Sequence, residues 1–203
     1  MRFITSFYRT EKGKTALIRL QVQRKDGMPV VFAAVSDGGN GEEFAVRLTE
    51  WFYSAALPVC RRGGVDKCAD RVERLLAEEL AETEQAAAPA VFFAIGGECV
   101  IAWQGDADIR FFQQCFDKNT GQTLTWYAED LTFRRLFVQA GVSILLGNGE
   151  YFAHVDGQSL NMCLPGRGLE QERQAERHLA ETAQEAERRG AKDVAAILLV
   201  TVE

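Results

Sequence analysis

Residues 30–58 read VVFAAVSDGGNGEEFAVRLTEWFYSAALP, and this stretch decides the fold. Its first part, 30–35, is an unbroken apolar run, which is typical of a strand buried on both faces. The turn signal at 37–39 follows, and then a helix is expected over 40–57, with apolar residues on one face and Pro58 at its end. The stretch therefore predicts a buried strand, an acidic turn and a helix that packs on a sheet.

Further strands and helices extend this pattern on both sides. Residues 1–8 and 15–23 are expected to be strands, the second because apolar and polar residues alternate in it. A second helix is expected over 65–85 and a third, with a thin apolar stripe, over 169–189. The other expected strands are 91–95, 99–103, 109–113, 123–127, 133–139, 143–146 and 194–202. Strands in two groups with helices between them predict an α+β sandwich, and we expect one domain over 1–203.

Composition narrows the classes of function. The chain has 203 residues, 47% of them hydrophobic, and a formal net charge of −6. Binding to nucleic acid or to an anionic membrane needs a positive surface, so neither is expected. The first residues, MRFITSFYRTEK, are too polar for a signal peptide, and no apolar run is long enough to span a bilayer. We therefore expect a soluble cytoplasmic protein.

The cysteines point to the same compartment. Their number is odd and no two have a CxxC spacing, which favours free thiols in a reducing cytoplasm over a zinc site or disulfides. The five are Cys60, Cys68, Cys99, Cys115 and Cys163.

Three familiar catalytic signals do not hold. Gly13-Lys14-Thr15 resembles the end of a phosphate-binding loop, but the required earlier glycine is absent and a strand is expected to follow. The stretch 141–145 lacks the second glycine of a nucleophile elbow. His178 is expected to be solvated on the third helix, and His154 to be packed in an apolar stretch. A Ser/His/Asp hydrolase is therefore not indicated.

Acidic residues at strand ends offer another chemistry. Asp37 follows the first buried strand, Asp106 lies in a Gly-Asp turn, and Asp193 directly precedes the last strand. Carboxylates that converge at strand ends can bind hard cations. The alternative is that they are ordinary turn residues, because Asp-Gly and Gly-Asp are common turn dipeptides.

Four blocks along the chain, in order, resemble the protein phosphatase 2C family, the metal-dependent (PPM-type) serine/threonine phosphatases, and its short bacterial members most. Residues 30–58 are similar to the family's strand, Asp-Gly-Met-Gly-Gly turn and helix with Trp-Phe and Leu-Pro. VFFAIGGECVIAWQGDADIRFF (91–112) is similar to the strand pair joined to Gly-Asp-Ser-Arg. SILLGNGEYF (143–152) matches the strand that ends in Ser-Asp-Gly, and RRGAKDVAAILLVTVE (188–203) matches the last helix, Asp-Asn and strand.

The resemblance implies a four-layer αββα sandwich with two metal ions, Mg²⁺ or Mn²⁺, at one end. In the family, metal-activated water attacks a phosphoserine or phosphothreonine. The resemblance gives Asp37 the role of bridging both metals, the Gly38 carbonyl a place on one of them, and Asp193 a place on the second. The turn at Asp106 is mainly structural in the family. We expect strands 30–35 and 194–202 to lie side by side, so that Asp37 and Asp193 meet.

The departures from the family pattern bear on activity. The Ser-Asp-Gly carboxylate is replaced by Asn148, so a metal here would be bound through Asp37, the Gly38 carbonyl, Asn148 and Asp193. The turn after Asp37 is one residue short and lacks the Met. The family's early Arg and Asn-Glu-Asp segment, which holds phosphate, has no clear counterpart, although Arg9 or Lys14 could substitute for it.

Three hypotheses follow. The first is a metal-dependent serine/threonine phosphoprotein phosphatase of bacterial signalling. The second is an inactive phosphatase-fold module that binds partner proteins or phosphoproteins. The third is an unrelated α+β domain whose Asp-Gly turns are only turns.

Overall fold

Two antiparallel five-stranded sheets form the centre of the molecule. The computed structural model describes residues 1–36, 41–62, 65–81, 89–105, 107–114, 121–125, 128–161 and 168–203. Sheet A has the order β1-β10-β9-β6-β7 and sheet B the order β2-β3-β4-β5-β8. The strands of sheet A are β1 (Arg2–Arg9), β10 (Ala195–Val202), β9 (Val142–Gly147), β6 (Asp108–Gln114) and β7 (Gly121–Thr125). Those of sheet B are β2 (Ala16–Gln23), β3 (Pro29–Ser36), β4 (Pro89–Ile95), β5 (Glu98–Gly105) and β8 (Ala128–Phe137).

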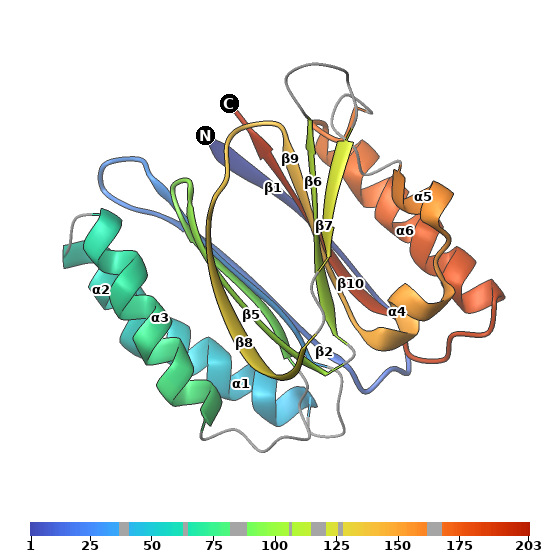
Figure 1. The fold of residues 1–203 in the computed structure, drawn as a ribbon, viewed down its shortest axis with the longest axis horizontal. Coiled ribbons are helices and arrows are strands. Elements are labelled where there is room, and N and C mark those ends of the chain that lie inside the picture. The colour runs from blue at the N-terminus through green and yellow to red at the C-terminus, as the bar shows by residue number, and fades with distance from the viewer. Residues whose placement is uncertain are drawn as a thin grey trace.

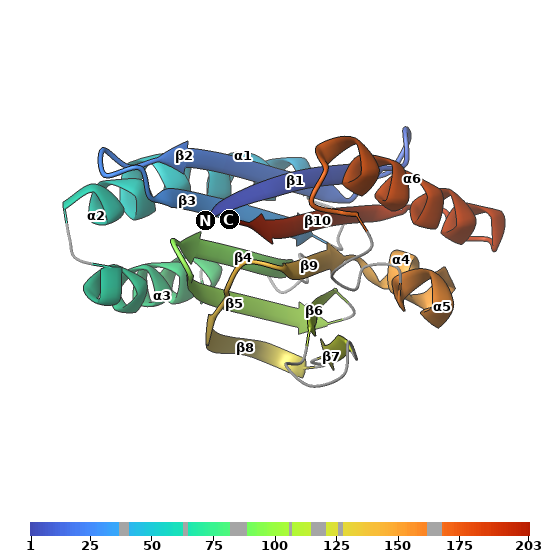
Figure 2. The same cartoon turned by 90° about the horizontal axis from the view of Figure 1, so that it is seen from above.

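Helices cover the outer face of each sheet, as Figures 1 and 2 show. The helices on sheet B are α1 (Gly41–Trp51), the π-helical turn η1 (Phe52–Ala56), α2 (Leu57–Arg62) and α3 (Val65–Ala81). Those on sheet A are α4 (Gly149–His154), α5 (Gly157–Asn161) and α6 (Glu172–Arg188). The four-layer αββα sandwich that the resemblance implied is therefore confirmed.

Three apolar layers lie between the four structural layers. The middle one joins the two sheets, and β3 and β10 supply its centre. Their contributing residues are Val31, Ala33 and Val35 from β3, and Ala195, Ile197 and Leu199 from β10. Both strands are buried along their whole length because helices cover the faces that the other sheet does not. The strands expected side by side thus belong to different sheets and pack face to face.

The helix after the first buried strand does not end at Pro58. It continues through η1 and α2 to Arg62, and the Leu57 N–H donates to the carbonyl of Phe52, five residues back. Proline has no N–H and its ring crowds the carbonyl four residues earlier, so an ordinary helical turn cannot accommodate it unstrained. The wider turn immediately before Pro58 relieves this conflict, and the helix goes on where the sequence pattern predicted a stop.

Two short helices were not expected. α4 and α5 follow β9 directly, where the sequence indicated only the end of a strand. Each has about one and a half turns, too few for an apolar stripe to be visible in the sequence. The third helix runs over Glu172–Arg188, within the expected range, and its stripe of small residues is buried against sheet A. In the described part of the chain, no helix is long and apolar enough to cross a membrane.

The described cysteines are free thiols, as the sequence indicated. Cys60, Cys68 and Cys99 are all buried, whereas Cys115 and Cys163 lie outside the described residues. Burial raises the pKa of Cys60 to about 12, with a further contribution from nearby Cys68, and burial also raises the pKa of Cys99. Since the thiolate is the reactive species, both thiols should be inert in the folded protein.

This inertness can be measured by alkylation. With iodoacetamide at pH 8, Cys60 and Cys99 are expected to stay unlabelled in the folded protein and to become fully labelled in concentrated urea. Peptide mapping by mass spectrometry reports each site separately. Labelling of either thiol at similar rates with and without urea would contradict the burial described here.

Candidate functional site

Two of the four predicted metal ligands, Asn148 and Asp193, lie at one end of the sandwich, which we call the pole. The pole is the end at which β3 and β9 finish and β10 begins, opposite the two chain termini (Figure 1). Asn148 directly follows β9, and Asp193 lies two residues before β10. Asp37 and Gly38, together with Asp106, lie outside the described residues. Their assignments therefore stay predictions.

The turn between β1 and β2 forms the centre of the pole. The Thr10 N–H donates to the carbonyl of Val194 over 2.9 Å, and the Val194 N–H donates to the Thr10 hydroxyl over 3.0 Å. The Thr10 hydroxyl itself donates to a carboxylate oxygen of Glu187 at 2.7 Å. These bonds fasten the turn to the chain segment that carries Asp193.

Asp193 binds the same turn with one of its two carboxylate oxygens. Its Oδ2 accepts the backbone N–H groups of Lys14, at 2.7 Å, and Thr15, at 3.1 Å. Its Oδ1 is buried and has no hydrogen-bond partner within the described part of the chain. A Cβ on Gly13 would lie 2.2 Å from this oxygen, so only glycine leaves room for it. The Oδ1 atom is the group at the pole whose chemistry suits a hard cation.

Ser36, the last residue of β3, lies beside this turn. It is paired with Ala16, the neighbour of Thr15, in the ladder between β2 and β3. Gly41, which begins α1, is packed on the same backbone: a Cβ there would lie 2.5 Å from the Lys14 carbonyl oxygen and 2.9 Å from the Ala16 nitrogen. Both residues that flank segment 37–40 therefore lie on the turn whose N–H groups bind Asp193.

Asn148 is fully buried, and every hydrogen-bonding position of its side-chain amide is occupied. Its Oδ1 accepts the N–H groups of Tyr151, at 3.2 Å, and Ala195, at 3.1 Å. Its Nδ2 donates to the hydroxyl of Thr15, at 3.2 Å, and to the carbonyl of Asp193. An amide has two acceptor lone pairs and two N–H donors, so these four bonds fill it. Asn148 caps α4 and joins β9, β10 and the turn at Thr15, an arrangement that leaves its oxygen no free lone pair for a metal.

Two cations considered for phosphate binding also lie at the pole. Arg9 ends β1 opposite Ala195, and Lys14 follows Gly13 in the turn. Both are exposed, and both stand at the end of the sheet where Asp193 lies. Both can offer positive charge to an anionic group at this face.

The structure can be compared with what the sequence predicted for the Gly13-Lys14-Thr15 segment and for the two histidines. The segment Gly13-Lys14-Thr15 leads into strand β2, not into a helix. His154 is partly buried and its Nδ1 bonds to the Glu150 carbonyl at 2.9 Å. His178, however, is not solvated as expected: it is partly buried on α6, and burial lowers its pKa.

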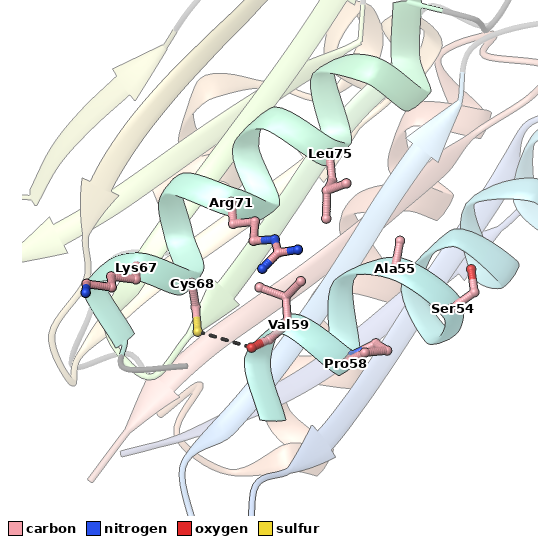
Figure 3. A pocket seen from close by; sticks show the side chains of 8 residues that line it. All are labelled: Ser54, Ala55, Pro58, Val59, Lys67, Cys68, Arg71 and Leu75. Atoms are coloured by element: carbon pink, nitrogen blue, oxygen red, sulfur yellow. Dashed lines mark hydrogen bonds between the residues drawn. The ribbon is translucent and has the colours of Figure 1, made fainter. Parts of the chain in front are cut away.

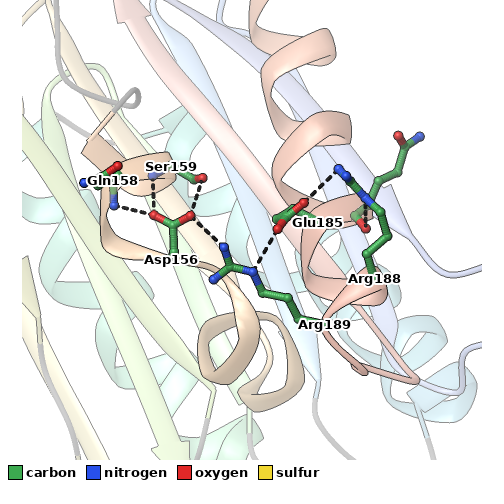
Figure 4. A network of polar contacts seen from close by, with 7 residues as sticks. Asp156, Gln158, Ser159, Glu185, Arg188 and Arg189 are labelled. Carbon is green, nitrogen blue, oxygen red and sulfur yellow. Dashed lines mark hydrogen bonds and ion pairs between the residues drawn. The ribbon is translucent and has the colours of Figure 1, made fainter.

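A polar network beside the pole holds α5 to α6 (Figure 4). The Asp156 carboxylate accepts the N–H groups of Gln158 and Ser159 and the Ser159 hydroxyl. Arg189 donates to Asp156 at 3.0 Å and to Glu185 at 2.8 Å. The hydrogen bonds from Ser159 hold the pKa of Asp156 below its usual value. The Asp-x-x-Ser spacing at the start of α5 is the signal that could have predicted this cap.

Sequence comparison finds no relative: no protein-family model and no curated protein matches the chain. Solved structures do match. The serine/threonine phosphatase of S. agalactiae has a TM-score of 0.66 at 11% identity, and the match covers 100% of both chains. The phosphatase domain of the cell fate determinant SpoIIE from Bacillus subtilis has a TM-score of 0.58 at 14% identity, covering 100% of this chain and 93% of that one.

A third match has a regulatory description. PppA, described as a key regulatory component of the T6SS in Pseudomonas aeruginosa, has a TM-score of 0.53 at 14% identity, covering 99% of this chain and 98% of that one. At such identities the likeness concerns the backbone alone. It extends over the full chain, however, and agrees with the layer order described above. The chain therefore has the fold of the protein phosphatase 2C serine/threonine phosphatases.

Proposed function

We propose that this chain is a phosphatase 2C-fold module of bacterial signalling that binds partner proteins or phosphoproteins without efficient phosphate-ester hydrolysis. The observation that carries the proposal is the state of Asn148. At the position where the resemblance places a carboxylate, a neutral amide makes four hydrogen bonds within the fold. This residue supports the pole instead of offering charge to a metal.

The charge balance of a two-metal site supports this proposal. Two divalent cations about 4 Å apart repel by about 17 kcal/mol at an effective dielectric constant of about 20, and bridging anions must offset most of that energy. The resemblance supplies two carboxylates here, Asp37 and Asp193, and half of the Asp193 carboxylate is already bound to backbone N–H groups. Two carboxylates carry a charge of about −2 against the +4 of two divalent cations, so they offset only part of the repulsion.

One observation favours a second candidate, a weak phosphatase with a single Mg²⁺ or Mn²⁺. Among the described residues the Oδ1 of Asp193 has no partner, and it is a buried anionic oxygen that a cation would satisfy. Asp37, the Gly38 carbonyl and Asp193 are the residues proposed to hold such an ion, which when bound would activate water for attack on phosphorus. Lys14 would then help to hold the phosphate group at the exposed side of the turn.

Turnover measurements separate the two candidates. We expect the wild-type protein and the Asp37→Asn variant to hydrolyse p-nitrophenyl phosphate and a phosphothreonine peptide at the same background rate in excess Mn²⁺. A phosphatase that uses Asp37 as a ligand would lose at least about tenfold in rate, since even residues behind the ligands contribute that much. The Asp156→Asn variant, which changes a carboxylate away from the metal position, serves as the matched control.

Binding of the same phosphopeptide completes the test. Fluorescence anisotropy is expected to show saturable binding to wild-type protein without loss of phosphate. Mn²⁺-dependent turnover that Asp37→Asn abolishes and Asp156→Asn preserves would overturn the proposal in favour of the enzyme. Absence of both binding and turnover would remove the phosphoprotein-binding part of it.

A further inference from the structure

A groove runs between the two helical segments that cover sheet B, far from the pole. It has a volume of about 460 Å³ and lies between η1–α2 on one side and α3 on the other (Figure 3). Its lining residues are Ser54, Ala55, Pro58, Val59, Lys67, Cys68, Arg71 and Leu75. At about 1.5 Å per residue, the helix from Gly41 to Ser54 is about 20 Å long, so the groove is separate from the candidate metal site.

The wall of the groove is apolar and held in place by the helix geometry. Ser54 and Ala55 belong to the wide turn η1, and Pro58 and Val59 follow it in α2. Across the groove, the Cys68 thiol donates to the Val59 carbonyl at 3.5 Å and ties α3 to α2. Wide turns of this kind are frequent at functional sites, because they displace side chains from the regular helical path.

Two cations line the groove at neighbouring positions of α3. Lys67 and Arg71 are four residues apart, so they lie on the same face of the helix. Figure 3 shows the Arg71 guanidinium directed from α3 into the space between the two helices. Both residues are exposed, and neither has an ion-pair partner among the residues that the structure describes.

Three other arginines, two in this helical layer and one in the adjoining strand, differ in that respect. Arg47 pairs with Glu79, Arg74 lies 4.0 Å from Glu78, and Arg135 pairs with Asp70 and with Glu73 at 3.1 Å. On a chain with a net charge of −6, the two cations of the groove are thus a local positive site beside apolar surface. At physiological salt the Debye length is about 8 Å, so a ligand in the groove responds mainly to the charges close to it.

We propose that this groove binds an acidic segment of a partner protein that also carries apolar side chains. The apolar side chains pack on Pro58, Val59 and Leu75, and a carboxylate of the segment forms the paired hydrogen bonds that the planar Arg71 guanidinium favours. Lys67 adds a second positive charge at the end of the groove. The segment thus binds in a groove between helices, and its negative charge makes the binding selective. This binding requires no chemistry at the pole.

Peptides of simple composition test the charge and the location together. The probe is a dye-labelled ten-residue peptide of glutamate and leucine, compared with peptides of the same length that carry lysine or glutamine instead of glutamate. We expect the glutamate peptide to bind with a Kd of about 10–100 µM at 0.1 M salt, and Arg71→Glu to weaken it about tenfold. The matched control is Arg74→Glu, on the same helix but outside the groove.

Each further outcome bears on the proposal. Shift changes in the nuclear magnetic resonance spectrum at Cys68, Arg71 and Leu75 on addition of the peptide, and an affinity that Asp37→Asn leaves unchanged, would support a groove independent of the pole. Failure of the glutamate peptide to bind at 1 mM, equal binding of the lysine peptide, or equal effects of Arg71→Glu and Arg74→Glu would overturn it. Circular dichroism confirms that each variant is folded.

Discussion

Replacement of Gly41 by alanine is expected to destabilise the protein by about 2–3 kcal/mol, although alanine normally favours a helix. The added Cβ would lie 2.5 Å from the carbonyl oxygen of Lys14 and 2.9 Å from the nitrogen of Ala16. Both are backbone atoms of the turn and of β2, which cannot move aside as a flexible side chain can, and overpacking of this kind costs about 1–3 kcal/mol. Thermal unfolding should show a drop in Tm of about 5–10 °C for a chain of this size.

Gly157 provides the matched control, because it also occupies the first position of a helix. A Cβ on Gly157 would meet no atom within 4 Å. Gly157→Ala should therefore be neutral or stabilise by up to about 1 kcal/mol, through reduced freedom of the unfolded chain. Similar Tm values for the two variants would contradict the packing of Gly41 on the turn that binds Asp193.

Replacement of Asn148 by alanine is expected to be the more damaging change, at about 3–5 kcal/mol. It removes a helix cap, which alone is worth about 1 kcal/mol. It also leaves the Ala195 N–H, the Tyr151 N–H and the Asp193 carbonyl without the partner they have now. Each buried polar group left unsatisfied costs about 1–3 kcal/mol, so the losses add up even if some groups find water. Urea unfolding followed by circular dichroism gives the free energy directly.

Asp156→Ala is the control for the capping contribution alone. Asp156 caps α5 as Asn148 caps α4, but it is partly exposed and makes no bond to a strand of the sheets in the described contacts. Its loss should cost only about 1 kcal/mol. Equal destabilisation by the two substitutions would show that Asn148 acts only as a helix cap. It would contradict the inference that Asn148 joins β9, β10 and the turn at Thr15.

Much of the fold could be predicted because burial leaves a strong trace in the sequence. β3, β4 and β10 are buried along their whole length and almost entirely apolar, since each is covered on both faces. The alternation in 15–23 indicated β2, which is half-covered. Such patterns do not show which sheet each strand joins. The assignment of β3 and β10 to opposite sheets depends on long-range pairing, and the sequence led us to expect the two strands side by side.

The errors have equally local causes. Pro58 is a reliable stop signal unless the preceding turn widens, and nothing in one sequence announces that widening. Helices α4 and α5 are too short for a periodic pattern, and their stability comes from caps at Asn148 and Asp156. The order of the family-like blocks along the chain indicated which residues to expect at the pole. The use of the Asn148 amide was not, because it depends on Thr15 and Ala195, which are distant in the sequence.

The most direct test of the account is a crystal structure of the protein grown with Mn²⁺, with anomalous scattering used to locate the ions. The account predicts at most one manganese peak, beside the Oδ1 of Asp193, with the Asn148 amide still bonded to the N–H groups of Tyr151 and Ala195. Two manganese peaks bridged by Asp37, with the Asn148 oxygen turned to one of them, would contradict it.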